Sequence, residues 1–235
     1  MISPITVALL RGNCPSGFCL HARESCVLSH RATAKRLDDF MRGRYVGRKL
    51  ACCALGVSES KTAILPDSRG VPWVEHDDLG LMPYSISLSH TIGVAGAAII
   101  ELPFLVGVDV ECPISSWRGV VRDYFDEIET GICVTETAAD IPWRVAEIWA
   151  QKEAGLKALG VGLSVPTSTV CVSDSGTRVC NAWNHAKLGI RGLDRYSGWS
   201  LDAWVRRYAG VVLAVAVASR ARGAEVSPPD AVMLV

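Results

Sequence analysis

The pattern of apolar and polar positions predicts one long helix early in the chain. From Ser29, a residue type that caps helices, to Gly56, a residue type that often follows them, there is no proline and most residues favour helix. Gly43 and Gly47 favour a kink within it. Residues 61–84 contain three prolines and several glycines, which predicts a loop with at most short strands.

The pattern changes after this segment, where short apolar runs bounded by turn residues predict buried strands. These runs are residues 86–88, 93–101, 105–111, 168–173, 199–206 and 210–219. Between them, Asp140 and Pro142 mark the start of a helix that we expect to reach about Gly160, because proline in a first helical turn loses no hydrogen bond.

This order of elements predicts an α+β fold with two halves of similar size. We place the boundary after Leu102, so that residues 1–102 form an N-terminal half and residues 103–220 a C-terminal half. Residues 221–235 include a Pro-Pro pair and no periodic apolar pattern, which predicts a flexible tail.

Composition excludes several classes of protein. The chain has 24 Lys plus Arg and 24 Asp plus Glu, so it lacks the basic excess of a non-specific nucleic-acid binder and must hold any anionic ligand with local groups. Nine cysteines without framework spacing indicate reduced thiols and predict a cytoplasmic protein. No apolar run approaches the roughly 20 residues that cross a bilayer, so we expect no membrane span.

Two carboxylates lie two residues apart in the apolar segment 107–111. On a strand, Asp109 and Glu111 point to the same face. Two buried acids on one face repel each other unless a cation compensates them, and a hard divalent ion such as Mg²⁺ prefers oxygen ligands. The alternative is that Glu111 lies in solvent beyond the strand end while Asp109 pairs with an arginine. The pair alone leaves both interpretations open.

A second pair lies on the predicted helix within residues 149–157. Glu153 and Lys157 are four residues apart and share a face, which in isolation indicates an ordinary surface ion pair worth about 0.3–0.5 kcal/mol. The helix is rich in large apolar residues, however, so we expect it to be largely buried. A metal and a phosphate would then explain its charged side chains.

Three weaker signals are cationic. His90, with Ser89 beside it between two predicted strands, is a candidate hydrogen-bond donor to a phosphate, although a lone histidine is more often structural. Arg44 and Arg48 lie four apart on the first helix, where an anion between them would relieve their repulsion; two solvated arginines are the alternative. Arg69 adds a cation on a tight turn.

Taken together and in this order, the motifs resemble the Sfp-type 4′-phosphopantetheinyl transferases. The family pattern runs Arg-x-x-x-Arg, Arg/Lys-Gly-x-Pro, Ser-His, Gly-Val/Ile-Asp-Val/Ile-Glu and Trp-x-x-Lys-Glu-x-x-x-Lys. The last two motifs are the specific ones, and residues 107–111 and 149–157 match them. The segment 124–129 between them resembles the family's Phe-Ser-x-x-Glu stretch, and the resemblance covers about residues 35–160.

The resemblance implies a monomeric enzyme of two pseudo-symmetric α+β halves with the active site in the cleft between them. It would transfer the 4′-phosphopantetheine arm of coenzyme A to a serine of an acyl or peptidyl carrier protein, as a holo-[acyl-carrier-protein] synthase does, and release adenosine 3′,5′-bisphosphate. Its carrier would belong to fatty acid, polyketide or nonribosomal peptide synthesis.

The resemblance also implies residue roles. Asp109, Glu111 and Glu153 would hold Mg²⁺, or Mn²⁺ in its place, and Glu153 would take the serine proton directly or through a water. Catalytic contacts to the phosphates would come from Lys157 and His90. The remaining coenzyme A contacts would be Arg44, Arg48, Arg69, Gly70, Pro72, Ser89 and Lys152. Val71 stands where many members of the family have lysine, which argues against a 3′-phosphate contact at that position.

Two other functions remain open from the sequence. An inactive carrier-binding protein of the same fold would have lost at least one acidic ligand, and none is lost here. A different Mg²⁺-dependent phosphotransfer enzyme would be compatible with the acids alone, and a coenzyme A binding measurement would separate it from the first interpretation.

Overall fold

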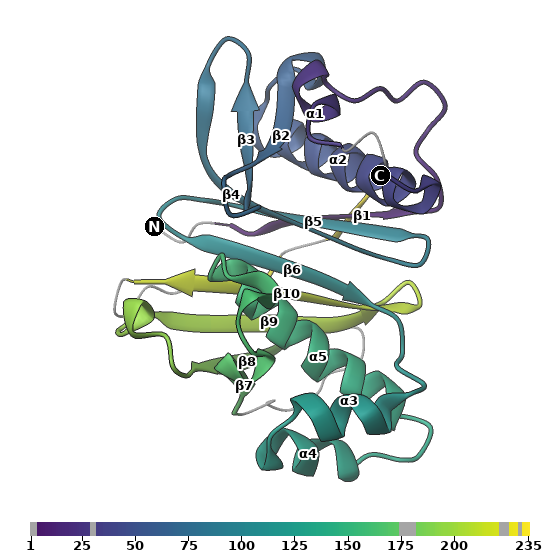
Figure 1. The fold of residues 1–235 in the computed structure, drawn as a ribbon, viewed down its shortest axis with the longest axis vertical. Coiled ribbons are helices and arrows are strands. Elements are labelled where there is room, and N and C mark those ends of the chain that lie inside the picture. Colours follow the sequence, from purple (N-terminus) through teal and green to yellow (C-terminus); the bar gives the residue numbers. More distant parts are fainter. Residues whose placement is uncertain (1–3, 29–31, 174–181, 221–225, 230–231) are drawn as a thin grey trace.

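The computed structural model describes residues 4–28, 32–173, 182–220, 226–229 and 232–235. It confirms the predicted α+β class and contains two sheets, each with one long helix on its outer face (Figure 1). The first sheet has the order β11-β1-β5-β4-β3-β2 and the second β6-β10-β9-β8-β7. The proposed division after Leu102 falls between β5 and β6.

The first sheet is antiparallel except where β11 runs parallel to β1. Its strands are β1 (Thr6–Arg11), β2 (Thr62–Pro66), β3 (Pro72–His76), β4 (Gly80–Thr91), β5 (Val94–Glu101) and β11 (Val232–Leu234). The helices on this side are α1 (Ala22–Ser25) and α2 (Ala34–Leu55), with a short 3-10 turn at Glu59–Lys61.

The second sheet is antiparallel throughout. Its strands are β6 (Leu105–Glu111), β7 (Val170–Val172), β8 (Asn184–Ile190), β9 (Ser200–Tyr208) and β10 (Val211–Ser219). Its helices are α3 (Trp117–Tyr124), α4 (Glu127–Val134) and α5 (Ile141–Ala158), and 3-10 turns lie at Gly162–Ser164, Thr167–Thr169 and Asp194–Tyr196.

Three apolar clusters give the molecule four layers. One cluster fills the space between α2 and the first sheet, and another lies between the second sheet and α3, α4 and α5. The third lies between the two sheets, where Val7 and Leu9 of β1 meet Val108 of β6 and Val215 of β10. The two sheets therefore pack face to face, and each long helix covers an outer face (Figure 1).

A row of serines on β4 joins the two sheets. The hydroxyl oxygens of Ser85, Ser87 and Ser89 accept hydrogen bonds from the backbone N–H groups of Val106, Val108 and Val110 at 2.9, 3.0 and 3.3 Å. Successive serines are two residues apart, so they share one face of β4. Because β6 is an edge strand of its own sheet, these hydroxyls satisfy N–H groups for which no neighbouring strand supplies a carbonyl.

The first helix is shorter than predicted and continuous. Its N-cap is Thr33, whose side chain accepts from the backbone N–H of Arg36, and Gly56 ends it with a φ of 67°. The predicted cap, Ser29, lies outside the described residues. Gly47 allows β4 to pack closely against the helix, because an added Cβ would lie 2.8 Å from Leu88 Cδ2. Close packing, and not the predicted kink, therefore explains the glycine at this position.

Residues 61–84, predicted as a loop with at most short strands, do form two short strands, β2 and β3, but they also contain the start of the long strand β4 and belong to the first sheet. Pro66 and Pro72 lie at strand ends, where a missing N–H costs no ladder bond. Asp67 closes the turn between them, because its carboxylate accepts from the backbone N–H groups of Arg69 and Val71, both at 2.8 Å.

The predicted flexible tail is wrong for Val232–Leu234, which pairs with Val7–Leu9 of β1. The sequence pattern also gave no expectation of β8, α3 or α4. Among the described residues, no helix is long and apolar enough to span a membrane.

Candidate active site

The strand β6 and the helix α5 bring the predicted carboxylates together. They approach so closely at Gly107 that an added Cβ would lie 1.9 Å from the carbonyl oxygen of Ala154. Glycine is therefore required there, and this contact sets β6 with its two acids beside α5 with Glu153 and Lys157. Asp109 is 4 % exposed, whereas Glu111 and Glu153 are half-buried.

Asp109 is held by one of its two oxygens. Its Oδ1 accepts from Lys157 Nζ at 2.6 Å and from Ser89 Oγ at 2.8 Å. Lys157 Nζ also donates to Ser89 Oγ and to the carbonyl oxygen of Val108, both at 3.1 Å. The other oxygen, Asp109 Oδ2, is buried with no hydrogen-bond partner. The interpretation of Asp109 as the partner of an arginine is wrong, because its partner is Lys157.

The three carboxylates repel one another. Burial raises the pKa of Glu111 to about 7, with further contributions from the charges of Asp109 and Glu153. Burial also raises the pKa of Glu153, with Asp109 adding to the rise and Lys157 opposing it. The interpretation of Glu111 as a solvated strand end is therefore wrong, and the cluster carries more negative charge than Lys157 alone compensates.

The donor set fits a divalent cation by its chemistry. The described part of the chain holds no group of three or more His, Cys, Asp or Glu side chains already gathered as a ligand set. The fit rests instead on the buried, unpartnered oxygen of Asp109 and on the burial that, with repulsion from neighbouring carboxylates, raises the pKa of both glutamates. Carboxylate oxygens of this kind are the ligands that Mg²⁺ takes in proteins.

The raised pKa of Glu111, caused first by burial, gives a pH dependence that we expect to measure. The pKa of Glu111 is about 7 in the folded protein and near its ordinary value of 4.5 in the unfolded chain. The contribution of Glu111 to the free energy of unfolding is therefore fully present below pH 4.5 and is lost as the pH rises to 7. Glu111→Gln should therefore raise the melting temperature more at about pH 8 than at about pH 5.5, in the presence of EDTA. Glu101→Gln, at an exposed strand end, is the control, and equal gains for Glu111→Gln at both pH values would contradict the assignment.

Two cavities lie along β4, one lined by Ser89 and the other by Lys157, the two side chains that contact Asp109. One, of about 430 Å³, is lined by Arg36, Arg44, Ser89 and His90 among others. The other, of about 410 Å³, is lined by Arg69, Gly70, Val71, Pro72, Lys157 and residues 160–164. Leu88 lines both, so the cavities are neighbours. Most of the predicted coenzyme A contacts thus border these two neighbouring cavities, and both halves line the second.

Arg44 has the environment of an anion-binding group. Its guanidinium lies 4.2 Å from the centroid of the Phe40 ring, and its Nε is buried with no hydrogen-bond partner. Burial lowers its pKa, which the charge of Glu24 partly offsets. That Nε lies 4.0 Å from Glu24 Oε1, so an internal carboxylate faces it, while the residue as a whole lines the first cavity.

Arg48 points away from both cavities into the protein. Its Nη1 donates to the carbonyl oxygen of Cys19 at 2.9 Å and its Nη2 to that of Glu59 at 3.1 Å. Glu24 is fully buried; its Oε2 lies 3.5 Å from Arg48 Nη1 and its Oε1 lies 4.0 Å from Arg44 Nε. An anion does lie between the two arginines, as their spacing suggests, but it is an internal carboxylate. The prediction that Arg48 contacts the nucleotide is wrong, because its guanidinium is occupied by groups of the protein interior.

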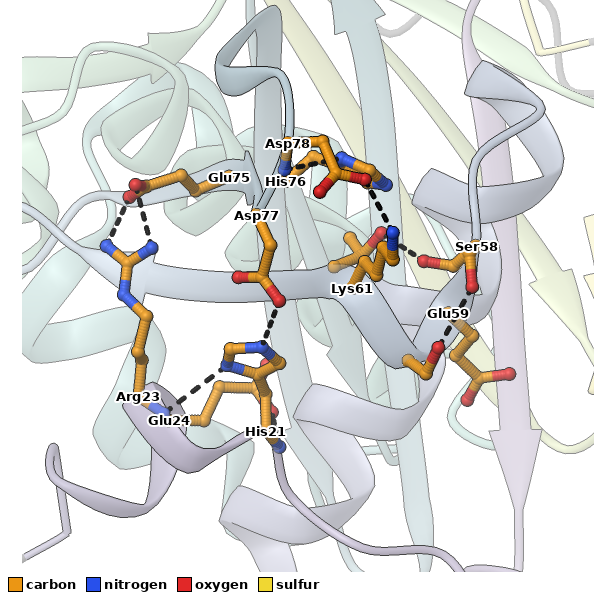
Figure 2. A network of polar contacts seen from close by, with 12 residues as sticks. His21, Arg23, Glu24, Ser58, Glu59, Lys61, Glu75, His76, Asp77 and Asp78 are labelled. Carbon is orange, nitrogen blue, oxygen red and sulfur yellow. Dashed lines mark hydrogen bonds and ion pairs between the residues drawn. The ribbon is translucent and has the colours of Figure 1, made fainter.

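The segment that carries Glu24 is fastened to the first sheet (Figure 2). The carboxylate of Glu24 accepts from the backbone N–H of Ile64 at 2.8 Å and from that of His21 at 3.0 Å. Two ion pairs join this segment to the sheet: Arg23 with Glu75 at 2.7 Å and His21 with Asp77 at 3.2 Å. A third ion pair, Lys61 with Asp78 at 2.7 Å, lies within the sheet itself. Sequence reasoning missed Glu24, since its only local signal is the spacing of three from His21 across α1.

Lys152 is also wrongly predicted as a coenzyme A contact. It is 1 % exposed, and its Nζ donates to both carboxylate oxygens of Glu129 at 2.8 and 2.7 Å. Glu129 is fully buried and also accepts from the backbone N–H of Val172 at 2.9 Å. This pair links α4, α5 and β7. The spacing of Asp126 and Glu129, which form a capping box, is the signal that could have pointed to it.

Comparison with known proteins gives one family. Residues 105–216, from β6 into β10, match the model of the 4′-phosphopantetheinyl transferase superfamily. This segment includes Asp109, Glu111, Glu153 and Lys157. A search of curated proteins found no match to the chain.

Proposed function

Because residues 105–216 form a domain of the 4′-phosphopantetheinyl transferase superfamily, we propose that this chain converts apo carrier proteins to their holo forms. The phosphopantetheine arm of coenzyme A would pass to a serine of an acyl or peptidyl carrier protein, with release of adenosine 3′,5′-bisphosphate. The observation that carries the proposal is the cluster of Asp109, Glu111, Glu153 and Lys157 beside two cavities lined by cations.

The charges suit the two ends of the coenzyme A nucleotide. Arg44 and His90 border the first cavity, and Arg69 and Lys157 border the second. Arginine and lysine on opposite sides of one region favour a ligand with phosphates at more than one position. We place the 3′-phosphate by Arg44 and His90, and the pyrophosphate by Lys157.

The cleaved bond is that between the two phosphates of the pyrophosphate, so negative charge grows on the departing bisphosphate. A bound Mg²⁺, held by Asp109, Glu111 and Glu153, would neutralise part of that charge. Lys157 sits where its ammonium can stabilise the rest. Glu153, whose pKa burial raises, is suited to accept the serine proton, because a base is most effective when its pKa approaches the working pH.

The test is intact mass spectrometry of a panel of apo carrier proteins from fatty acid, polyketide and peptide synthesis. Each is incubated with coenzyme A, Mg²⁺ and the enzyme. We expect at least one carrier to gain the mass of a phosphopantetheinyl arm, and EDTA to abolish the gain. Unchanged masses across the panel, with folded enzyme that binds coenzyme A, would leave an inactive carrier-binding protein; no binding would favour another phosphotransfer reaction.

The two arginines of α2 should respond differently to replacement. We expect Arg44→Ala to raise KM for coenzyme A about 10- to 100-fold with little change in kcat, because it would remove a charged hydrogen bond to a non-reacting phosphate. Arg48→Ala should instead lower the free energy of unfolding by about 2–3 kcal/mol, since it leaves buried groups without partners. Steady-state kinetics and urea unfolding of both variants measure this. A KM effect confined to Arg48→Ala would reverse the assignment.

A further inference from the structure

Each half of the molecule contains a fully buried glutamate with the same kinds of contact. Glu24 and Glu129 each complete the capping box of a short helix. Each carboxylate also accepts a backbone N–H from a strand, that of Ile64 in β2 at 2.8 Å for Glu24 and that of Val172 in β7 at 2.9 Å for Glu129. Each glutamate thus joins a short helix to a strand of its own half and faces a cation of the long helix there.

The two glutamates differ in how closely they hold those cations. Both oxygens of Glu129 accept from Lys152 Nζ, at 2.8 and 2.7 Å. Glu24 instead lies between two arginines of α2, with its Oε2 3.5 Å from Arg48 Nη1 and its Oε1 4.0 Å from Arg44 Nε. The carboxylate of Glu24 is therefore shared, and it faces Arg44 without a close hydrogen bond to it.

Arg44 depends on Glu24 more than Arg48 does. Arg48 also donates to two backbone carbonyl oxygens, at 2.9 and 3.1 Å, and these hold its guanidinium whether or not Glu24 is charged. Within the described residues, the polar and ring contacts of Arg44 are only the carboxylate of Glu24 and the ring of Phe40. Loss of the charge of Glu24 should therefore free Arg44 while Arg48 keeps its place.

We propose that Glu24 is a positioning residue for the first cavity, where it holds the guanidinium of Arg44 in place for an anionic ligand. The Nε edge of Arg44 faces Glu24, and Arg44 lines the cavity together with His90. A guanidinium binds a phosphate more tightly when it is already oriented, because less side-chain freedom is then lost on binding. The identification of the ligand as the 3′-phosphate of coenzyme A rests on the proposed function, whereas the orientation of Arg44 does not.

The binding test compares coenzyme A with 3′-dephospho-coenzyme A by calorimetry, without carrier protein. We expect Glu24→Gln to weaken binding of coenzyme A about 3- to 10-fold, less than Arg44→Ala does, and to leave binding of 3′-dephospho-coenzyme A within about twofold of wild type. Weakening of both ligands by one factor would mean that Glu24 supports only the fold. Unchanged or tighter binding of coenzyme A would also overturn the proposal.

Glu129→Gln is the matched control, because it neutralises an equally buried capping-box glutamate in the other half. It should lower the free energy of unfolding without changing the preference for coenzyme A over 3′-dephospho-coenzyme A. A comparable change of preference in Glu129→Gln would assign the effect of Glu24→Gln to lost stability.

A double-mutant cycle tests whether Glu24 acts through Arg44. In the Arg44→Ala background, Glu24→Gln should alter the preference for coenzyme A no further, and a further change would contradict the proposed route. Glu24→Asp keeps the charge, so it should retain more of the preference than Glu24→Gln. It takes the place of Glu24→Gln in the cycle if that variant does not fold.

A second readout needs no ligand. The Nε–H signal of Arg44 in heteronuclear NMR spectra, identified by its absence from Arg44→Ala, reports whether the guanidinium is held. We expect Glu24→Gln to shift and broaden this signal, and Glu129→Gln to leave it as in wild type. An unchanged Arg44 signal in Glu24→Gln would overturn the positioning role. Because this measurement uses neither coenzyme A nor carrier protein, it separates failure of this inference from failure of the proposed function.

Discussion

Replacement of Lys157 by methionine is expected to slow phosphopantetheinyl transfer by roughly 100-fold or more, the usual effect of losing one preorganised charge at a departing oxyanion. The ammonium lies 2.6 Å from Asp109 Oδ1 and is only partly exposed. Methionine keeps the length and apolar volume of the side chain, so the change tests the charge. Single-turnover rates with saturating coenzyme A and Mg²⁺ give the measurement.

Lys157→Met should also lower the melting temperature, whereas replacement of its partner Asp109 should not. Without Lys157, the carboxylates of Asp109, Glu111 and Glu153 face one another without a compensating cation, so the melting temperature should fall in EDTA. Asp109→Asn removes a negative charge from the same cluster, so it should slow transfer while the melting temperature rises or holds. Parallel loss of stability in both variants would mean that the pair acts only as a structural salt bridge.

Lys61 is the control for this experiment. It forms a 2.7 Å ion pair with Asp78, but both side chains are exposed. Ion pairs between exposed side chains contribute little to stability. Lys61→Met should therefore leave the transfer rate unchanged, and a comparable loss of rate there would show that the effect of Lys157 is not local.

The second large effect is expected at the buried pair of Lys152 and Glu129. Lys152→Met should lower the free energy of unfolding by about 3–5 kcal/mol, because it leaves a fully buried carboxylate without its cation. Removing both charges, with Lys152→Met and Glu129→Gln together, should cost less than the single change. Urea unfolding with unchanged m-values measures this.

Lys61→Met again supplies the matched surface change. If Lys152→Met costs no more than that control, the ion pair carries no stability and the burial of α5 rests on its apolar residues alone.

The sequence was most informative where spacing along one element decided the answer. The i, i+2 spacing of Asp109 and Glu111 placed both acids on one face of β6, and the i, i+4 spacing of Glu153 and Lys157 placed both on one face of α5. The start of α5 at Ile141 followed from Asp140 and Pro142. Each of these inferences needed only the geometry of a single strand or helix.

The sequence was least informative about which distant side chains contact a given helix or strand. Arg44 and Arg48 share a helix face as expected, but their anion is Glu24, brought in by α1 through contacts with β2 and β3. Lys152 stands in a family motif, yet its partner Glu129 comes from α4. Such pairings depend on the packing of distant segments, which composition and periodicity do not encode.

Prolines misled the prediction over residues 61–84 for a related reason. Pro66 and Pro72 were taken as signs of a loop, although their positions at the ends of β2 and β3 are compatible with a sheet. What distinguishes the two cases is the pairing of β2 with β3 and of β3 with β4. A single chain segment carries little information about its neighbours in a sheet.

The serine row of β4 restricts how the two halves can move. Each hydroxyl meets one N–H, and successive partners on β6 are two residues apart. If β4 slid along β6, all three serine hydrogen bonds would break. They could form again only where serine hydroxyls and N–H groups next line up, two residues or about 6.6 Å further along. Small translations between the halves are therefore opposed. The turn that carries Arg69 and residues 160–164 line the second cavity from opposite halves and lie outside the serine row, so the three bonds restrain the strands beneath the cavity and not these two segments.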